Sequence, residues 1–353
     1  MKSSALKFTS SASVDAAESN ELLQGTRNYF LRTKLYRPQL TDDHVLRDRL
    51  LNRLDQLGKK PLALISAPAG YGKTTLVSAW VHRTALPCAW VSLDSADNDL
   101  AIFVGYTIAA MRSIFPTFGE NLLVYTCAAR LPPVETITTL LSNEMDALGD
   151  NFVLVFDDLH VISNPAIYGL LEAILLHPPR SMHLALITRY DPPMYLSKLR
   201  AGNKAVELRA GDLRFSAEES RSLLNVLGDG EGSATAIDFL ARKTEGWAVG
   251  LRLATTALEQ VTAPVIQQAM LRADNHMVVD YLINEVLSLQ SPAVRDFLLY
   301  SSILDRFTLP LCAAIMGELY DEKEVTAALQ SRGLFIESLD PNDLWFRFHD
   351  LFR

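Results

Sequence analysis

The sequence is poor in cysteine, and the three cysteines that it has are far apart. Cys88, Cys127 and Cys312 have neither the spacing of metal ligands nor the density of a disulfide scaffold. A chain of 353 residues can bury a large apolar interior and does not need disulfide bonds to hold it. We therefore expect three reduced thiols in a cytoplasmic protein.

Basic residues are also too few for a broad nucleic-acid surface. The chain has 33 Lys and Arg against 41 Asp and Glu, which gives a formal net charge of -8. Binding to a phosphate backbone normally requires an excess of positive charge. The composition therefore argues against recognition of DNA or RNA over a large part of this surface.

Long hydrophobic runs are missing, although 49% of the residues are hydrophobic. No apolar stretch reaches the ~18 residues that a transmembrane helix requires. The segment 1–24 is rich in Ser and Ala and lacks the continuous apolar core of a signal peptide. We expect residues 1–28 to be a disordered leader, with a cleaved targeting peptide as the alternative, and the protein to have no membrane partner.

Short apolar runs alternate with longer amphipathic stretches from residue 61 onward. Strands that are apolar on both faces and separated by helices predict a parallel sheet covered on both sides, an α/β fold. The expected strands are 61–67, 88–94, 151–158, 182–189 and a short one at 206–208. Ahead of them, one helical face ended by Gly58 is predicted from the spacing of Val45, Leu46, Leu50, Leu51, Leu54 and Leu57.

The segment APAGYGKTT has the pattern of a phosphate-binding P-loop between a strand and a helix. Two glycines allow the turn to point its backbone N–H groups at an anion. Lys73 supplies a positive charge for the outer phosphates, and the Thr74 hydroxyl suits a Mg²⁺ ligand. Ala67 replaces the first glycine of the usual pattern, and we expect the position to tolerate one methyl group. The predicted nucleotide-binding residues of the loop are Ala67, Pro68, Ala69, Gly70, Tyr71, Gly72, Lys73, Thr74 and Thr75.

Charged residues end two other predicted strands. Asp157 and Asp158 end VLVFDD, and Arg189 ends LITR. Because ligands bind outside the carboxyl ends of parallel strands, these side chains should emerge beside the P-loop. We predict that Asp157 holds Mg²⁺ with Thr74, and that Asp158, Lys73 and Arg189 are catalytic, with Asp158 orienting the attacking water and Arg189 reading the γ-phosphate. The alternatives are solvated acids that cap a strand and a surface ion pair between Arg189 and Asp191.

Strand signals fade after Phe215. Ser216 and Glu219 form a capping-box pattern, and helical periodicity continues to Leu258 and resumes near Pro264. Two short apolar strands joined by the polar turn 340–343 then indicate a winged-helix module. We predict a P-loop nucleotide-binding domain at 29–214, a helical domain at 215–270 and a winged-helix domain at 271–353.

Six segments together resemble the MalT-like group of STAND ATPases, the large ATP-binding regulators of the LuxR type. In chain order they are LRTKLYRP, APAGYGKTT, VFDDLH, LITR, EGWAVGLRLA and RFHDLFR, and they cover residues 31–353. The resemblance implies a switch with slow ATPase activity that ADP keeps shut. An inducer and ATP would open the switch, so that it self-associates and activates transcription.

The same resemblance implies further contacts to ATP or ADP. Val45 and Arg47 would lie near the adenine, and His349 would reach the ADP β-phosphate. Trp247 and Gly250 fall in the helical-domain motif that follows the nucleotide site. Without the resemblance, His349 is only a histidine in an aromatic-rich strand, where a structural role is the default.

Family members continue into a helical-repeat sensor and a C-terminal helix-turn-helix domain. We therefore expect this chain to carry the switch alone, with inducer and DNA bound through modules outside it. Two other P-loop classes stay open. A small-molecule kinase would need a lid and an acceptor pocket within about 200–250 residues. An AAA+ motor would need an arginine finger in trans, which the sequence does not assign.

Overall fold

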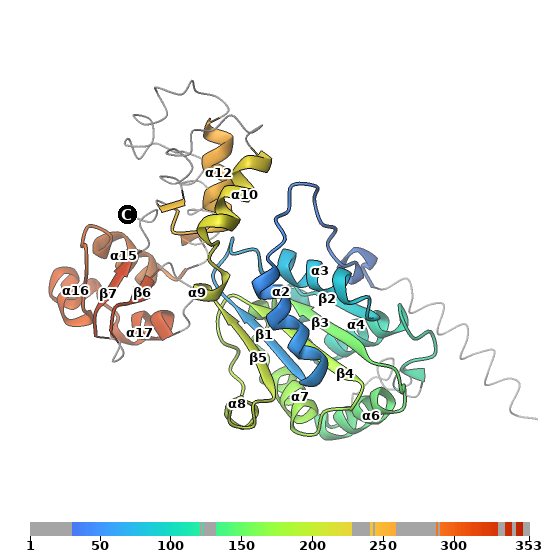
Figure 1. The fold of residues 1–353 in the computed structure, drawn as a ribbon. Coiled ribbons are helices and arrows are strands. Elements are labelled where there is room, and N and C mark those ends of the chain that lie inside the picture. The colour runs from blue at the N-terminus through green and yellow to red at the C-terminus, as the bar shows by residue number, and fades with distance from the viewer. Residues whose placement is uncertain are drawn as a thin grey trace, which may run out of the picture.

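The computed structural model describes residues 30–120, 122, 132–227, 241–242, 244–258, 287–288, 290–330, 336–340 and 344–348. The predicted leader at 1–28 and His349 lie outside the described residues. Figure 1 shows a sheet flanked by helices, a helical segment beyond one end of the sheet, and a separate lobe that carries a β-hairpin. None of the helices in the described part has the length and hydrophobicity that a membrane span requires.

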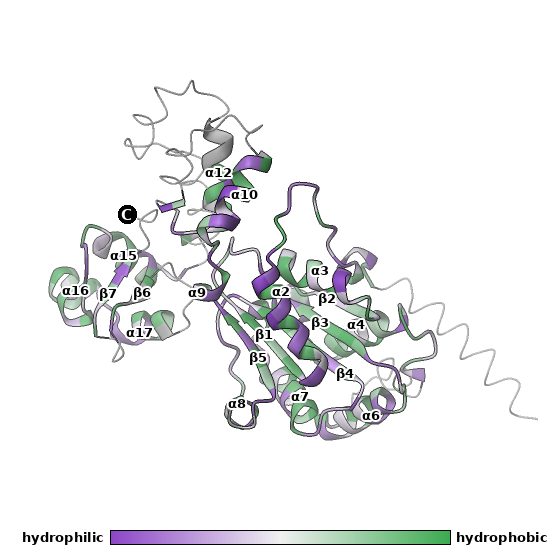
Figure 2. Cartoon of the chain, viewed as in Figure 1, coloured by the Kyte–Doolittle hydropathy of each residue, from purple (hydrophilic) through white to green (hydrophobic). Residues whose placement is uncertain are grey.

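Five parallel strands form the main sheet in the order β2-β3-β4-β1-β5. Their near-continuous apolar sequences are buried along the whole of β1, β3 and β4, which appear hydrophobic in Figure 2. The edge strand β5 instead alternates between buried and half-buried residues. All five predicted strands are confirmed: β1 Leu62–Ser66, β2 Cys88–Ser92, β3 Phe152–Asp157, β4 Met182–Thr188 and β5 Ala205–Arg209.

Helices cover both faces of this sheet (Figure 1). On β1, Ala63 and Ile65 pack with α2 and α3, whereas Leu62 and Leu64 belong to the core under α4, α6 and α7. Successive strand residues point to opposite faces, so one strand contributes to both cores. The bounds are α2 Asp48–Leu54, α3 Lys73–Thr84, α4 Leu100–Arg112, α6 Val134–Asp146, α7 Pro165–Leu176, α8 Ser197–Ala201 and α9 Ala210–Leu213.

The helix expected from Val45 onward starts later than its apolar spacing indicated. α2 begins at Asp48, while Val45 lines a cavity and Leu46 is 61% exposed. Arg47 has φ −109° and ψ 69°, outside the helical region, and its guanidinium donates to backbone carbonyls more than 160 positions away. A tertiary contact therefore overrides the local periodicity, and the prediction was wrong at this end.

The segment LRTKLYRP packs against the sheet domain. The buried Lys34 ammonium pairs with Asp97 and lies 4.3 Å from the centre of the Tyr106 ring. Phe30 packs edge-on against the same tyrosine, over Gly105, where a Cβ atom would come within 2.5 Å of the Phe30 ring. This motif therefore contributes packing and a buried ion pair.

The helical segment after the sheet contains α10 Ala217–Leu227 and α12 Ala248–Leu258. The capping box is confirmed, because the Ser216 amide donates to the Glu219 carboxylate at 2.9 Å and the Glu219 amide to the Ser216 hydroxyl at 3.1 Å. The predicted helical run is broken at Gly246, whose φ of +72° suits a turn. The Phe215 amide donates to the Gly246 carbonyl there at 2.8 Å, so this turn is tied to the start of the segment.

The C-terminal lobe has the predicted hairpin and, in α15, the end of the helical region predicted from Pro264; residues 264–286 of that region lie outside the described residues, and α16 and α17 were not predicted. β6 and β7 pair antiparallel, and the Asp340 carboxylate accepts from the Trp345 amide at 2.6 Å across the turn. Phe307 bridges to Phe346 and packs against Phe297 and Phe348, which forms an aromatic core. The elements are α15 Pro292–Ser301, α16 Leu309–Met316, α17 Glu322–Gln330, β6 Ile336–Ser338 and β7 Phe346–Phe348.

Candidate nucleotide-binding site

The P-loop connects β1 to α3 with the backbone geometry that its glycines permit. Gly70 has φ +77° and Gly72 has φ +72°, and Gly72 is the N-cap residue of α3. The first amides of a helix are not used by its own hydrogen bonds and are available to an anion. Ala67 is not among the described non-glycine residues with positive φ, so its methyl group causes no backbone strain there.

Lys73 is the first residue of α3 and is 8% exposed. Its ammonium donates to the Pro68 carbonyl at 2.9 Å, across the loop. Burial and the positive charge of Arg189 together lower the pKa of Lys73 to about 8. A bound anion beside this ammonium would favour its charged form and offset both effects. The position therefore suits a phosphate ligand.

Thr74 and Asp157 bring two oxygen ligands together. The Thr74 hydroxyl donates to Asp157 Oδ1 at 3.0 Å, and the same oxygen accepts from the Asp158 amide at 3.0 Å. Burial and the negative charge of Asp158 together raise the pKa of Asp157 to about 7. A cation at this point would favour the carboxylate form.

This pair fits Mg²⁺ bound together with phosphates. P-loop sites hold Mg²⁺ through one or two protein oxygens and the phosphates of the substrate. Within the described residues there is no group of three or more His, Cys, Asp or Glu side chains that could hold a metal without them. The donor set of Thr74 and Asp157 matches the first arrangement.

Asp158 and Arg189 lie at the ends of neighbouring strands, as the sequence predicts. Asp158 follows β3 with φ +57°, and its side chain is 50% exposed. Arg189 directly follows β4 and is close enough to influence the pKa of Lys73. The alternative partner for Arg189, Asp191, forms ion pairs with Arg200 and Arg209. The structure thus gathers Lys73, Asp158 and Arg189 around one point.

His160 belongs to the same cluster, and the sequence analysis did not identify it. Its Nδ1 lies 3.7 Å from Asp158 Oδ1, and the Tyr190 hydroxyl donates to its backbone carbonyl at 2.6 Å. Burial, together with the positive charges of Arg189 and Lys73, lowers the pKa of His160 to about 3. The imidazole is therefore neutral at physiological pH. Its place just after two strand-end acids was the signal that could have found it.

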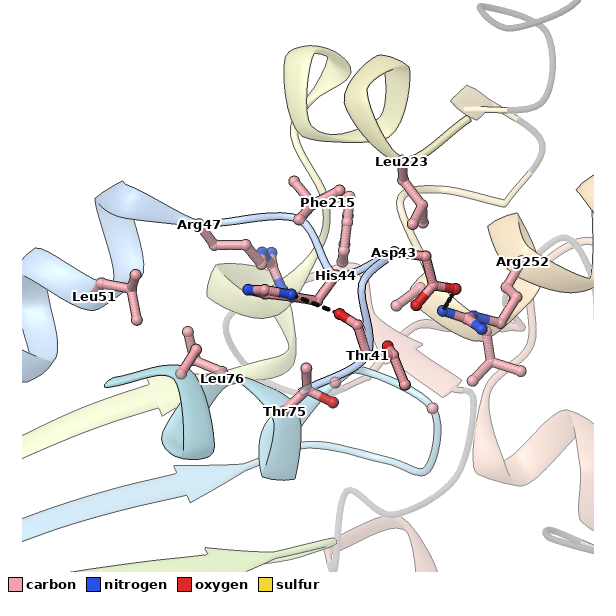
Figure 3. Close-up of a pocket in the computed structure, with 16 residues that line it drawn as sticks. Thr41, Asp43, His44, Arg47, Leu51, Thr75, Leu76, Phe215, Leu223 and Arg252 are labelled. Atoms are coloured by element: carbon pink, nitrogen blue, oxygen red, sulfur yellow. Dashed lines mark hydrogen bonds and ion pairs between the residues drawn. The ribbon is translucent and has the colours of Figure 1, made fainter. Parts of the chain in front are cut away.

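A cavity of about 170 Å³ opens beside the P-loop (Figure 3). Val45 lines it from the segment before α2, Thr75 from α3, Phe215 from the segment before α10, and Val249 from α12. Ligand sites combine apolar walls with a few polar groups, and this cavity has both. It adjoins the P-loop, because Gly70 and Gly72 also line it.

Arg47 lines this cavity but also holds its wall together. One guanidinium nitrogen donates to the carbonyls of Leu213 and Arg214, both at 2.8 Å, and lies 3.2 Å from the Glu219 carboxylate. The guanidinium also lies 4.2 Å from the centre of the Phe215 ring. Its Nη1 is buried and has no hydrogen-bond partner among the described residues, so one donor is available to a ligand.

The helical segment contacts the P-loop directly. The Trp247 indole donates to the Ala69 carbonyl at 3.1 Å, and the Val249 amide donates to the Gly70 carbonyl at 3.1 Å. A Cβ atom on Gly70 would lie 2.6 Å from the Trp247 indole nitrogen. Gly70 is therefore needed for this close approach as well as for the turn.

Sequence comparison relates the chain to known regulators. Residues 283–353 match the family model of the MalT winged helix domain. The chain is 32% identical over 324 residues to the HTH-type transcriptional regulator MalT of Cronobacter sakazakii. It is 30% identical over 326 residues to the regulator of the same name from Klebsiella pneumoniae. Each alignment covers 91% of this chain, which spans 36% of the length of those relatives.

Structural comparison supports the fold. A Walker-type ATPase of Pyrococcus abyssi superposes with a TM-score of 0.59 at 17% sequence identity, over 90% of this chain and 97% of that protein. At this identity the likeness concerns the fold alone. The chain is thus similar to the MalT regulators over 91% of its own length, its residues 283–353 match the MalT winged helix domain, and its parallel sheet with the P-loop has the P-loop NTPase fold.

Proposed function

We propose that this chain is an ATP- and ADP-binding switch with slow ATPase activity, the regulatory core of a cytoplasmic transcriptional activator. The contact between Thr74 and Asp157 carries the proposal. It places a hydroxyl and a carboxylate side by side next to Lys73, the lysine of the P-loop. A P-loop that merely starts a helix would have no reason to bury an acid at this point.

Each residue of the cluster then has one task. Bound Mg²⁺ supplies a positive charge that neutralises the phosphates and favours displacement at the γ-phosphorus. Lys73 binds the outer phosphate oxygens, and Thr74 and Asp157 hold the ion. Asp158 orients the attacking water, and Arg189 contacts the γ-phosphate. The P-loop segment 67–75 holds the phosphates through its amides.

The nucleoside would occupy the cavity beside Val45 and Arg47. The buried Arg47 Nη1 is a donor without a partner among the described residues, and a base or ribose acceptor would satisfy it. His349 would approach the β-phosphate from the winged helix, two residues beyond Arg347. The cavity walls come from the sheet domain and the helical segment, which supports enclosure of the nucleotide between them.

The regulatory part of the proposal rests on the relatives. They are named HTH-type transcriptional regulators, and this chain spans 36% of their length. We infer that self-association follows ATP binding, and that an inducer and DNA bind through a sensor and a helix-turn-helix outside this chain. The helical and winged-helix elements that follow the sheet support a switch over a small-molecule kinase, which would use that length for a lid and an acceptor pocket.

Nucleotide retention tests the proposal. We expect purified protein to release ADP on acid extraction, and Lys73→Ala to lose most of it because the outer phosphates lose their charged partner. The exposed Lys59→Ala variant is the control for loss of one positive charge. Protein that contains no nucleotide and does not take up labelled ATP would refute the assignment.

A further inference from the structure

Three charged side chains and one tyrosine connect the winged helix to the P-loop. The Arg347 guanidinium, on β7, donates two parallel hydrogen bonds to the Glu245 carboxylate, both at 2.9 Å. Glu245 Oε2 also lies 3.2 Å from Arg214 Nη2. Arg214 in turn is hydrogen-bonded to Tyr71, the buried tyrosine in the P-loop. We call these four residues the charged latch.

The pair at its centre has favourable geometry. Paired parallel bonds between a guanidinium and a carboxylate are among the stronger polar contacts in proteins. The Glu245 side chain is 12% exposed and that of Arg347 is 29% exposed, so solvent screens the pair less than an open surface pair. Two arginines share one carboxylate, and removal of Glu245 would leave both without it.

Glu245 lies in a turn whose backbone conformation is constrained by tertiary contacts. It has φ +47°, a value that non-glycine residues adopt only when the surrounding structure imposes it. The next residue, Gly246, would place a Cβ atom 2.5 Å from the Phe215 carbonyl oxygen, and Trp247 donates to the P-loop at Ala69. The turn is therefore fixed to the P-loop and to the segment before α10. A displacement of Glu245 would shift the P-loop and that segment together.

Apolar packing continues along the same path. One cluster of buried side chains includes Tyr71 and Trp247 together with Phe297, Phe307 and Phe348 of the winged helix. Burial gives this contact affinity but little directional selectivity. The charged latch adds directional selectivity, because two parallel bonds to the oxygens of Glu245 restrict how β7 can be placed.

We propose that the charged latch holds the winged helix against the P-loop in the nucleotide-retaining form, and that nucleotide release requires the Glu245–Arg347 pair to open. This inference rests on the proposed nucleotide switch. By thermodynamic reciprocity, if the closed latch strengthens ADP binding, then bound ADP must strengthen the latch to the same extent.

The test is the rate of ADP release, measured by displacement of a fluorescent ADP with excess ATP. We expect Glu245→Gln and Arg347→Gln each to accelerate release about 5-fold to 30-fold, between the effects of an exposed and a buried pair. The double variant should release ADP no faster than the faster single variant, because both lose the same contact. Arg347→Lys should release ADP at a rate between those of the wild type and Arg347→Gln, since an ammonium cannot form the two parallel bonds.

Controls separate the latch from general stability. Glu207→Gln breaks an exposed ion pair with Arg200 at 2.7 Å on β5 and should leave ADP release unchanged. Because a replacement at Glu245 also changes a residue with positive φ, Arg347→Gln tests the pair from the other side. Salt should accelerate release from the wild type and have less effect on the variants.

The outcomes distinguish the latch from the switch itself. Wild-type protein that does not bind ADP would refute the proposed function. Wild-type protein that retains ADP, with Arg347→Gln and Glu245→Gln both folded by circular dichroism and both releasing ADP at the wild-type rate, would overturn the latch alone. Additive effects in the double variant would also overturn it.

Discussion

The part of the site proposed to bind phosphate (the phosphate end) and the part proposed to bind the nucleoside (the nucleoside end) are built in different ways. At the phosphate end, one loop of nine consecutive residues meets side chains from two strand ends of the same sheet. At the nucleoside end, the cavity wall joins segments that are far apart in the chain: Asp43 and Arg252, which form an ion pair there, are 209 positions apart (Figure 3). The first can be complete within the sheet domain, whereas the second exists only while the helical segment is docked.

This difference suggests a division of work. Chemistry at the γ-phosphate should depend on the rigid sheet, and retention of the nucleotide should depend on the docked segments. Rigid elements hold reacting groups with the accuracy that catalysis requires, while contacts between segments can open. Substitutions at Asp158, Gly70 and Asp157 test that division.

Asp158→Asn should lower the ATP hydrolysis rate by roughly 100-fold to 10,000-fold, the range for loss of a group that handles the attacking water. Binding of ADP should change little, because Asp158 lies at the phosphate end and its side chain is half exposed. Single-turnover hydrolysis and equilibrium binding measure the two effects. The exposed Asp150→Asn variant is the matched control, and normal turnover by Asp158→Asn would remove this residue from the mechanism.

Gly70→Ala should disturb both the phosphate end and the nucleoside end of the site, because Gly70 lies where the two ends meet. The substitution forces alanine into φ +77° and places its methyl group 2.6 Å from the Trp247 indole. We expect a loss of about 2–4 kcal/mol in unfolding free energy, from backbone strain and overpacking together, and weaker ADP binding.

Gly149→Ala is the matched control for that experiment. Gly149 has φ +75°, but a Cβ atom there would meet nothing within 4 Å. The Gly149→Ala variant should lose only the part of the unfolding free energy that comes from backbone strain, about 1–2 kcal/mol. Equal losses in the two variants, measured by urea denaturation, would show that the contact between Trp247 and the P-loop adds nothing.

Asp157→Asn should show a pH-dependent effect on stability without nucleotide. Burial raises the pKa of Asp157 to about 7 from an ordinary value of 3.8. The folded protein therefore holds a proton that the unfolded chain releases between these values, and stability falls as the pH rises through this range. At pH 8 the Asn variant should be more stable than the wild type by about 1–3 kcal/mol.

The same variant separates a metal ligand from a strand cap. The stability difference should shrink at pH 4.5, where the folded wild-type carboxyl is protonated. Mg²⁺ should tighten ADP binding by the wild type and have little effect on the variant. Thermal melts at the two pH values and titration calorimetry with and without Mg²⁺ provide the measurements. Equal Mg²⁺ dependence in both proteins would contradict the assignment of Asp157.

The sequence predicted most of the phosphate end because that end is local. The strand, glycine turn and helix that carry Lys73 and Thr74 follow each other directly, and Asp157, Asp158 and Arg189 end strands of the same sheet. Periodicity and the strand-end rule suffice for such a site. His160 was missed because its significance depends on the approach of Arg189 and Lys73 from other elements.

The nucleoside end could not be predicted in the same way. Periodicity placed Val45 on a helix, whereas the structure places it on a cavity wall, because Arg47 bonds to the carbonyls of Leu213 and Arg214. The helical run before Leu258 was likewise interrupted at Gly246 by a contact with Phe215. In both cases a contact with a residue far away in the sequence determined the local backbone conformation.

Hydrophobic period and turn chemistry were enough to predict the individual strands, the P-loop and the winged-helix hairpin, because each of these is specified within a short stretch of the chain. Only the tertiary structure decided where the segments meet: Trp247 on the P-loop, Arg47 behind the cavity wall, and Arg347 on Glu245. The reason is physical. A strand or helix is specified by neighbours along the chain, whereas an ion pair or a close backbone approach depends on groups that only folding brings together.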